Sequence, residues 1–336
     1  MVNWVQLLRN HFVACLGKNA GLRQQAIDVD NAGTVINFWI PEHKKVQEGK
    51  QKHAVVLVHG FAGDGMMTWG FQVGALAKGG YDVYVPDLVH FGGSTSPSPD
   101  RSVAFQAPCI AAGLRKLGVV EWCTVVGFSY GGLVAFDMAA AFPSLVRSVV
   151  ISGAAVSYTA AMNDAMLRRF GVGSITKLML PDTVRGVTRL LTAAFYRKPW
   201  LPRRLVRDFQ KVMFSHRKER GEMLENQGRD EAGLQAPVFQ QVTQIHVLIF
   251  LGESHKYIAC CSCTSLIGLR YIDLHAENDN FFPLEIGKKL EEELGEKAML
   301  QTIRKAGHLA HLERPCVYNR CLKKFLEHVD ALPSTT

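Results

Sequence analysis

Short apolar runs rich in valine and isoleucine alternate with longer segments of helical spacing along most of the chain. The runs lack polar alternation, which is typical of strands covered on both faces, and therefore of a mostly parallel sheet between helices. The expected strands are 26–30, 34–40, 54–58, 82–86, 124–127, 148–152 and 299–303. The expected helices are 68–78, 102–117, 130–142, 284–294 and 315–328. This order predicts an α/β fold.

Composition excludes several other classes of protein. Apolar residues make up 48% of the chain, with 38 Lys plus Arg against 30 Asp plus Glu, which excludes intrinsic disorder. The apolar stretch 125–142 contains several glycines and Asp137, so it is excluded as a membrane span. Residues 1–21 have the spacing of an amphipathic helix rather than of a secretory signal. We therefore expect a cytoplasmic protein with reduced cysteines.

Positive charge is concentrated in one part of the chain. Between Ala154 and Pro237 there are 15 Lys plus Arg and 8 Asp plus Glu, which accounts for +7 of the net charge of +8. This asymmetry predicts a second module. Its densest part, 197–207, interleaves cations with Trp200 and Leu201 and could contact anionic lipid at a membrane surface. A solvated basic helix face is the alternative, and no nucleic-acid-binding motif accompanies the segment.

The strongest chemical motif is Gly127-Phe128-Ser129-Tyr130-Gly131. It follows an apolar strand and precedes a helical pattern, which is the context of a nucleophile elbow. Gly127 and Gly131 suit such a turn because the strand and helix approach closely there. Ser129 would then project at a helix N-terminus, where negative charge is favoured. The alternative is a glycine-rich turn without a catalytic role.

A second motif, His59-Gly60-Phe61, follows the expected strand 54–58. The backbone N–H groups of Phe61 and Tyr130 could together form an oxyanion hole for an acyl-transfer reaction. We expect His59 to hold this loop structurally rather than to act as a general base.

The general base is expected late in the chain. Gly307-His308 follows the strand 299–303 and precedes the final helix, so His308 could reach back to Ser129, whereas His311 is expected to pack or cap. Asp279, in a turn 29 residues before His308, is the expected acid partner, with Glu277 as the competitor. The chain order Ser, Asp, His is the order of α/β-hydrolases.

Together with the loop from Pro86-Asp87-Leu88 to Gly92-Gly93-Ser94, these motifs resemble the α/β-hydrolase superfamily over nearly the whole chain. The sequence is most similar in pattern to plant members related to monoacylglycerol lipases and carboxylesterases. The resemblance implies a triad of Ser129, Asp279 and His308, and an oxyanion hole at Phe61 and Tyr130. It also implies a core of 1–153 and 238–336, with a helical cap, 154–237, inserted after the sixth strand.

One segment departs from this family pattern. The 27 residues Val247–Asp273 separate the expected strand segment Gln244-Ile245-His246 from Leu274, and removing them restores the pattern without a gap. We hypothesise that they are translated from a normally removed segment such as an intron, which transcript sequencing would test. Residues 245–251 and 271–275 should then compete for one strand position. Ala276, where the family usually has glycine, is expected to strain the acid turn.

The sequence therefore predicts a serine hydrolase that cleaves lipid-derived or other apolar carboxylic esters through an acyl-enzyme, with a small-molecule substrate. It needs no cofactor and no metal; Cys260, Cys261 and Cys263 lack a second ligand pair at metal-site spacing. Two alternatives stay open: a receptor-like protein that binds a ligand with little turnover, and a variant inactivated by the 247–273 insert.

Overall fold

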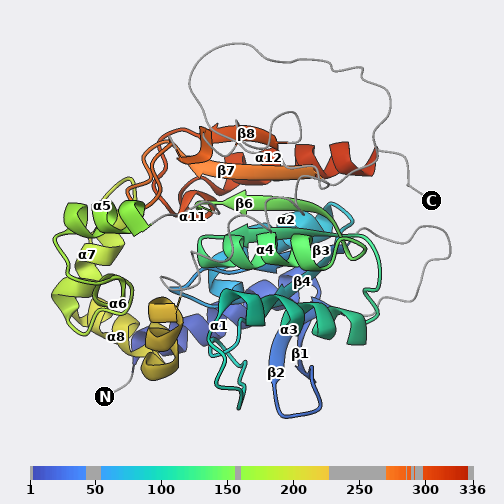
Figure 1. The fold of residues 1–336 in the computed structure, drawn as a ribbon, viewed down its shortest axis with the longest axis horizontal. Helices are drawn as coiled ribbons and strands as arrows, with labels where there is room; N and C mark the ends of the chain where they lie inside the picture. Colours follow the sequence, from blue (N-terminus) through green and yellow to red (C-terminus); the bar gives the residue numbers. More distant parts are fainter. Residues whose placement is uncertain are drawn as a thin grey trace.

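The computed structural model describes residues 3–42, 54–155, 160–226 and 270–331, apart from 285, 289–290 and 292–297. Its centre is an eight-stranded sheet in the order β1-β2-β4-β3-β5-β6-β7-β8. The strand β2 pairs antiparallel with both β1 and β4, and the strands from β4 to β8 are parallel. The α/β class predicted from the alternating pattern is thus confirmed (Figure 1).

The strands agree closely with the apolar runs. They are β1 (Leu22–Asp28), β2 (Val35–Pro41), β3 (Ala54–Val58), β4 (Asp82–Pro86), β5 (Cys123–Phe128), β6 (Val146–Ser152), β7 (Arg270–Ala276) and β8 (Ala298–Ile303). The strand β7 was not among the expected strands and was anticipated only as one of two competing segments. Among the expected strands, the largest difference is at β1, which begins before the predicted Ala26. It is an edge strand with alternating buried and exposed positions. Because Arg23, Gln24 and Gln25 are polar, the start of this strand is not part of an apolar run.

Helices cover both faces of the sheet (Figure 1). The helices α3 (Val103–Lys116) and α4 (Tyr130–Ala141) lie together on one face, and α1 (Trp4–Ala20), α2 (Gly65–Lys78) and α12 (Pro315–Asp330) lie on the other. The expected N-terminal helix is present as α1, capped by the Asn3 side chain, which accepts from the Gln6 N–H, and ending at Gly21 with a left-handed φ of 65°. Part of the helix expected over 284–294 lies outside the described residues.

A helical insertion follows β6 and lies at one end of the sheet, at the left in Figure 1. It contains α5 (Ala160–Phe170), α6 (Ile175–Met179), α7 (Val184–Ala194) and α8 (Arg203–Met213), and residues 217–226 are also helical. The end of the cap predicted at 237 lies outside the described residues, so the boundary stays a prediction.

The strand position between β6 and β8 is filled by Arg270–Ala276. Arg270 to Asp273 pair with Ser148 to Ile151 of β6, and Tyr271 to Ala276 pair with Ala298 to Ile303 of β8. Of the two segments expected to compete, 271–275 therefore occupies the sheet; residues 245–251 lie outside the described part. The last four residues of the 247–273 insert thus belong to the central sheet.

Ala276 closes β7 opposite Ile303, and the acid turn begins after it. The strain expected at this position stays a prediction.

In the part of the chain that the structure describes, no helix is long and apolar enough to cross a membrane. Five cysteines fall within the same part, and all five are free: Cys15, Cys109, Cys123, Cys316 and Cys321. Cys260, Cys261 and Cys263 lie outside the described residues.

Candidate active site

Ser129 lies at the sharp bend between β5 and α4. Its backbone is held at φ 53° and ψ −122°, a conformation that costs an ordinary residue on the order of 1–3 kcal/mol. The Ser129 N–H donates to the Ser152 carbonyl at the end of β6, and the Ser129 carbonyl accepts from the Gly132 N–H, both at 2.8 Å. The bend is therefore fixed by its neighbours, and strain of this kind is common at functional sites.

The glycines of this motif are required by close backbone approach. A Cβ atom at Gly127 would lie 2.2 Å from the Gly131 carbonyl oxygen, and one at Gly131 would lie 2.4 Å from the His59 carbonyl oxygen. Both neighbours are backbone atoms, which cannot move aside without displacing α4 or β3. Gly60 belongs to the same contact region, with the Phe128 ring against it. These positions thus let α4 start close to the His59-Gly60-Phe61 loop.

The structure brings Ser129, His308 and Asp279 together from loops 179 and 29 residues apart in sequence. The Ser129 hydroxyl lies 3.1 Å from Nε2 of His308, and Nδ1 of His308 lies 2.8 Å from Oδ2 of Asp279. All three residues are buried. With the proton on Nδ1, the ring donates to the carboxylate and its Nε2 accepts from the hydroxyl. This arrangement lets the imidazole take up the hydroxyl proton.

The Asp279 carboxylate is oriented from its own turn. Its Oδ1 accepts from the backbone N–H groups of Phe281 at 2.7 Å and Phe282 at 3.1 Å, which leaves Oδ2 facing His308. The ring of Phe281 packs against the His308 ring at a centroid distance of 4.8 Å, and that of Phe128 does so at 4.9 Å. The acid and the imidazole are thus held by backbone N–H groups and aromatic rings of the protein.

The two competing residues are engaged elsewhere. Glu277 accepts the N–H of Lys305 at 3.2 Å. His311 is fully buried beside the rings of Trp69, Phe128 and Tyr318. Burial, with a smaller effect from the charge of nearby His308, lowers the pKa of His311 to about 3. His311 therefore packs as a neutral ring, as the sequence suggested.

His59 supports the loop that follows β3. Its Nδ1 donates to the Gly60 carbonyl at 2.7 Å and its Nε2 accepts the Leu88 N–H at 3.0 Å. Burial lowers the pKa of His59 to about 4, so both bonds are those of a neutral ring. Phe61 comes next in this loop, and its ring meets that of Tyr130 edge-on at 5.9 Å. The two residues expected to form the oxyanion hole are therefore neighbours.

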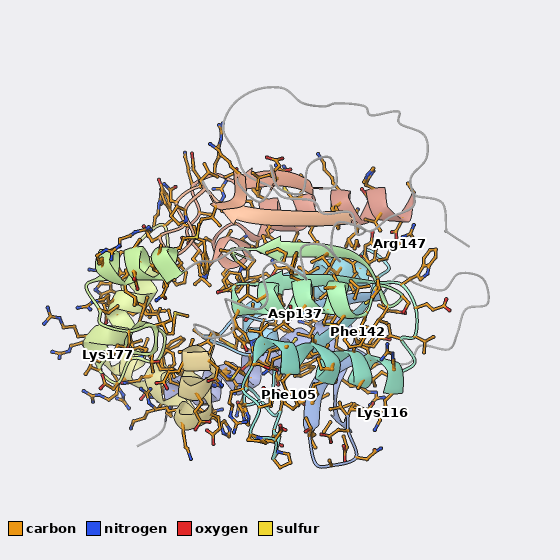
Figure 2. All side chains as sticks on the ribbon, viewed as in Figure 1. Phe105, Lys116, Asp137, Phe142, Arg147 and Lys177 are labelled. Carbon is orange, nitrogen blue, oxygen red and sulfur yellow. The ribbon has the colours of Figure 1, made fainter. Side chains whose placement is uncertain are left out.

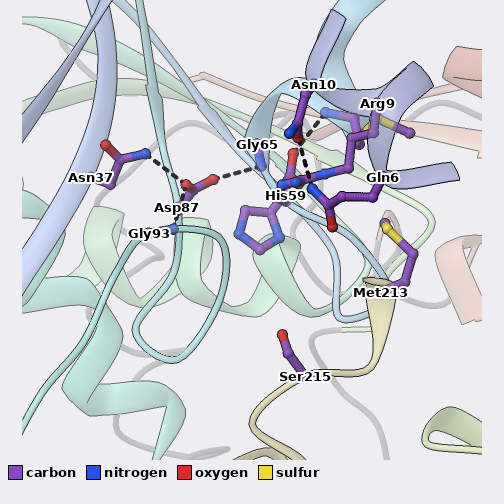
Figure 3. Close-up of polar contacts among 12 residues, drawn as sticks. Gln6, Arg9, Asn10, Asn37, His59, Gly65, Asp87, Gly93, Met213 and Ser215 are labelled. Atoms are coloured by element: carbon purple, nitrogen blue, oxygen red, sulfur yellow. Dashed lines mark hydrogen bonds and ion pairs between the residues drawn. The ribbon is translucent and has the colours of Figure 1, made fainter. Parts of the chain in front are cut away.

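A buried carboxylate that the sequence reasoning left without a role lies behind this loop. Figure 3 shows Asp87 between Asn37, Gly65 and Gly93, whose N–H groups it accepts at 2.8, 2.9 and 3.2 Å. Burial outweighs these bonds and raises the pKa of Asp87 to about 6. The Pro86-Asp87-Leu88 motif was a signal for this site, since an acid directly after a buried strand must find donors.

The helical insertion is tied to the loops that carry His308 and Asp279. The Glu313 carboxylate accepts the N–H of Gly307 at 2.6 Å and that of Tyr196 at 2.9 Å. The Leu309 N–H donates to the Ala194 carbonyl at 3.2 Å, and the Asn280 side chain donates to the Ala193 carbonyl at 3.0 Å. The end of α7 is thereby fixed to both loops.

Sequence reasoning missed this set of contacts. Glu313 is six residues beyond Gly307 and 117 residues from Tyr196, and no local pattern marks such a contact. Within the described residues, no group of three or more His, Cys, Asp or Glu side chains could hold a metal ion.

Comparison with known proteins gives the same architecture. A family model for the alpha/beta hydrolase fold matches residues 53–315. A membrane phospholipase A, described as a bacterial virulence factor, superimposes with a TM-score of 0.73 and 21% identity over 98% of this chain and 93% of its own. The 2-hydroxy-6-oxo-6-phenylhexa-2,4-dienoate hydrolase of Rhodococcus sp. strain RHA1 gives 0.68 and 18% over 91% and 99%.

Sequence relatives match a shorter region. Bifunctional epoxide hydrolase 2 of Sus scrofa is 32% identical over 98 residues, which is 29% of this chain and 17% of that protein. The chain thus matches a small part of this curated relative.

Proposed function

The chain belongs to the α/β-hydrolase fold family, and on that basis we propose that it is a serine hydrolase that cleaves carboxylic esters. The observation that carries the proposal is the buried hydrogen-bonded series from the Ser129 hydroxyl through His308 to Asp279. A strained serine at a strand-to-helix bend, aligned with an imidazole and an oriented carboxylate, has the requirements of an acyl-transfer nucleophile.

In the proposed reaction, Ser129 Oγ forms a bond to the ester carbonyl carbon while its proton moves to Nε2 of His308. The carbon–oxygen bond to the leaving alcohol then breaks, and His308 returns the proton to that alcohol. Water, activated by the same imidazole, attacks the acyl-enzyme and releases the acid. Asp279 keeps the proton on Nδ1 and stabilises the cationic ring in both halves. No cofactor takes part in these steps.

The backbone N–H groups of Phe61 and Tyr130 are the proposed donors to the developing oxyanion. Tyr130 is the first residue of α4, so its N–H belongs to the positive end of a helix. Phe61 is placed beside it by the His59 bonds described above. Each such donor is worth about 10²- to 10³-fold in rate.

We further propose an apolar, lipid-derived acyl ester as substrate. Aromatic rings of Phe128, Phe281 and Phe282 surround His308, and a membrane phospholipase A shares the fold. The motif resemblance to plant monoacylglycerol-lipase-like and carboxylesterase proteins supports the same class. In this proposal, residues 154–237 form a cap that selects the substrate.

The test is covalent labelling with an alkyl fluorophosphonate probe, which modifies an activated serine. We expect the wild-type chain to be labelled and Ser129→Ala to be unlabelled. Ser157, a serine outside the motif, provides the control substitution Ser157→Ala, which should leave labelling intact. Labelling that persists in Ser129→Ala would refute the proposal.

A second experiment tests the two alternative functions, a receptor-like protein with little turnover and a variant inactivated by the 247–273 insert. Chain-length series of p-nitrophenyl esters are compared for the full chain and for a version without Val247–Asp273. Activity confined to the shortened version would show that the insert inactivates the protein. Serine labelling without turnover in either version would favour a receptor-like role.

Glu313 is expected to act as a positioning residue for His308. In Glu313→Gln one carboxylate oxygen becomes an NH₂ group, which would face the N–H donors of Gly307 or Tyr196. We expect kcat for the preferred p-nitrophenyl ester to fall about tenfold with KM nearly unchanged, because a shift of the imidazole disturbs the reacting geometry. Glu327→Gln makes the same chemical change at an exposed pair with Lys323 on α12 and should keep full activity. An equal loss in both variants would contradict the positioning role.

A further inference from the structure

The segment 196–207, which joins α7 to the first turns of α8, is unusually exposed. Trp200 has 87% of its surface accessible, and Tyr196 and Leu201 follow at 42% and 41%. A tryptophan is rarely left this open to water, because it buries more apolar area than almost any other side chain. The exposed indole lies among the cations Arg197, Lys198, Arg203 and Arg204, all of which are exposed as well.

These cations form no ion pair within the part of the chain that the structure describes. The finding covers Arg197, Lys198, Arg203, Arg204 and Arg207. Asp208, the acid that follows them, is buried and accepts the backbone N–H of Trp4. The side chains of the segment therefore present positive charge that no described acidic side chain pairs with. Figure 2 shows side chains with nitrogen ends projecting from the outer side of the insertion.

The first turns of α1 extend this surface. The Trp4 N–H donates to the Asp208 side chain, and the Asn3 side chain donates to the Asp208 carbonyl, both at 3.3 Å. These bonds place α1 against α8 (Figure 1). Trp4 and Leu7 on α1 are 46% and 53% exposed. Two segments some 200 residues apart thus bring exposed apolar side chains to the same basic region.

We propose that segment 196–207, with Trp4 and Leu7 beside it, binds the surface of an anionic phospholipid bilayer. Arginine and lysine side chains next to an anionic bilayer are attracted to its headgroups, and indole rings prefer the boundary between headgroups and acyl chains. An acidic protein or a nucleic acid would account for the charge, and a base could stack on an indole ring, but neither accounts for the exposed aliphatic side chains of Leu201 and Leu7 beside it. The occupant that satisfies both features is a lipid surface.

The position of this surface fits an enzyme that draws its substrate from a membrane. Tyr196 and Arg197, where the segment begins, donate their backbone N–H groups to Glu313, which also holds Gly307 next to His308. A bilayer in contact with the segment would therefore lie on the side of the molecule where the insertion meets the loop that carries His308. Binding itself requires no hydrolysis, so it can be tested independently of the proposed activity.

The test is co-sedimentation with vesicles of phosphatidylcholine containing about one third phosphatidylserine. Serine substitution of four cations, Arg197, Lys198, Arg203 and Arg204, should lower the vesicle partition coefficient by about 100-fold. The matched control removes the same charge from helices α2 and α12 by serine substitution of Lys78, Arg320, Lys323 and Lys324, and should keep most of the binding. Trp200→Ala alone should lower the partition coefficient about fivefold.

Indole fluorescence gives a second measurement that does not depend on charge. On addition of the anionic vesicles, the emission of the wild-type protein should shift to shorter wavelength, and Trp200→Phe should lose most of the shift. Failure of the wild-type chain to sediment with anionic vesicles would overturn the proposal. It would also be overturned by equal loss in both fourfold variants, or by binding to polyglutamate as tight as to vesicles and indifferent to Trp200→Ala.

Discussion

Replacement of Asp279 by asparagine is expected to lower kcat/KM for the preferred p-nitrophenyl ester by about 10⁴-fold while the protein stays folded. The reason lies in how the carboxylate is held. Oδ1 accepts two backbone N–H groups, from Phe281 and Phe282, and Oδ2 faces Nδ1 of His308. An asparagine would keep its carbonyl oxygen toward the two N–H groups, and its NH₂ group would then face His308.

That NH₂ group can only donate, so Nδ1 of His308 would have to accept and the ring proton would move to Nε2. A proton on Nε2 points at the Ser129 hydroxyl, and the imidazole can then no longer act as its base. Activity is therefore lost because the His308 ring takes the wrong tautomer, and not because the protein unfolds. It should appear mainly in kcat, because no substrate contact is removed.

The matched control for this prediction is Glu277→Gln. Glu277 lies two residues away on the same loop and accepts the N–H of Lys305. The change is the same carboxylate-to-amide substitution, and we expect activity to stay within about threefold because the imidazole is not contacted. The assignment of Asp279 would fail if Asp279→Asn kept its activity while Glu277→Gln lost it.

The meeting of Ser129, His308 and Asp279 could be anticipated from the sequence because each residue follows a strand of the parallel sheet. Parallel strands end at one edge, so the loops after β5, β7 and β8 share that edge. The elbow glycines then indicate Ser129 in the loop after β5. The chain order Ser, Asp, His indicates Asp279 in the loop after β7 and His308 in the loop after β8. Their catalytic roles stay predictions until the variants are measured.

Other parts of the site depend on contacts that leave no local pattern. Glu313 meets Tyr196 only because the helical insertion folds back onto the last loop. The contact of α1 with Asp208 likewise joins two distant segments, and the sequence pattern of neither segment predicts that they meet. Asp87 could be noticed but not interpreted, because its three donors come from three separate segments: Asn37 from β2, Gly65 from the start of α2, and Gly93 from the loop after β4.

Stability is expected to fall as the solution is acidified from about pH 6.5 to about pH 4, mainly because three buried histidines stay neutral in the fold. The pKa values of His59 and His90 are lowered from 6.5 to about 4 and that of His311 from 6.5 to about 3, in each case chiefly by burial. Between these values and 6.5 the unfolded chain takes up protons that the folded chain does not. Each histidine then costs about 1.4 kcal/mol per pH unit.

Asp87 acts in the opposite direction. Burial raises its pKa from 3.8 to about 6, so over that window the folded state binds the proton that the unfolded state has lost. Its contribution is full below 3.8 and is lost as the pH rises through about 6. Three histidines against one carboxylate leave a net loss of about 2.8 kcal/mol per pH unit on acidification, which is large beside a total stability of about 5–15 kcal/mol.

His311→Phe isolates the largest of the three histidine shifts. Neither ring nitrogen of His311 has a hydrogen-bond partner among the described residues, and its neighbours Trp69, Phe128 and Tyr318 are aromatic, so phenylalanine fits the same space. With two histidines left against Asp87, the slope of the free energy of unfolding in urea between about pH 4 and about pH 6 should halve, to about 1.4 kcal/mol per pH unit. The exposed His11 on α1 supplies the control, His11→Gln, which should keep the wild-type slope. A slope unchanged in His311→Phe would show that another group controls acid unfolding.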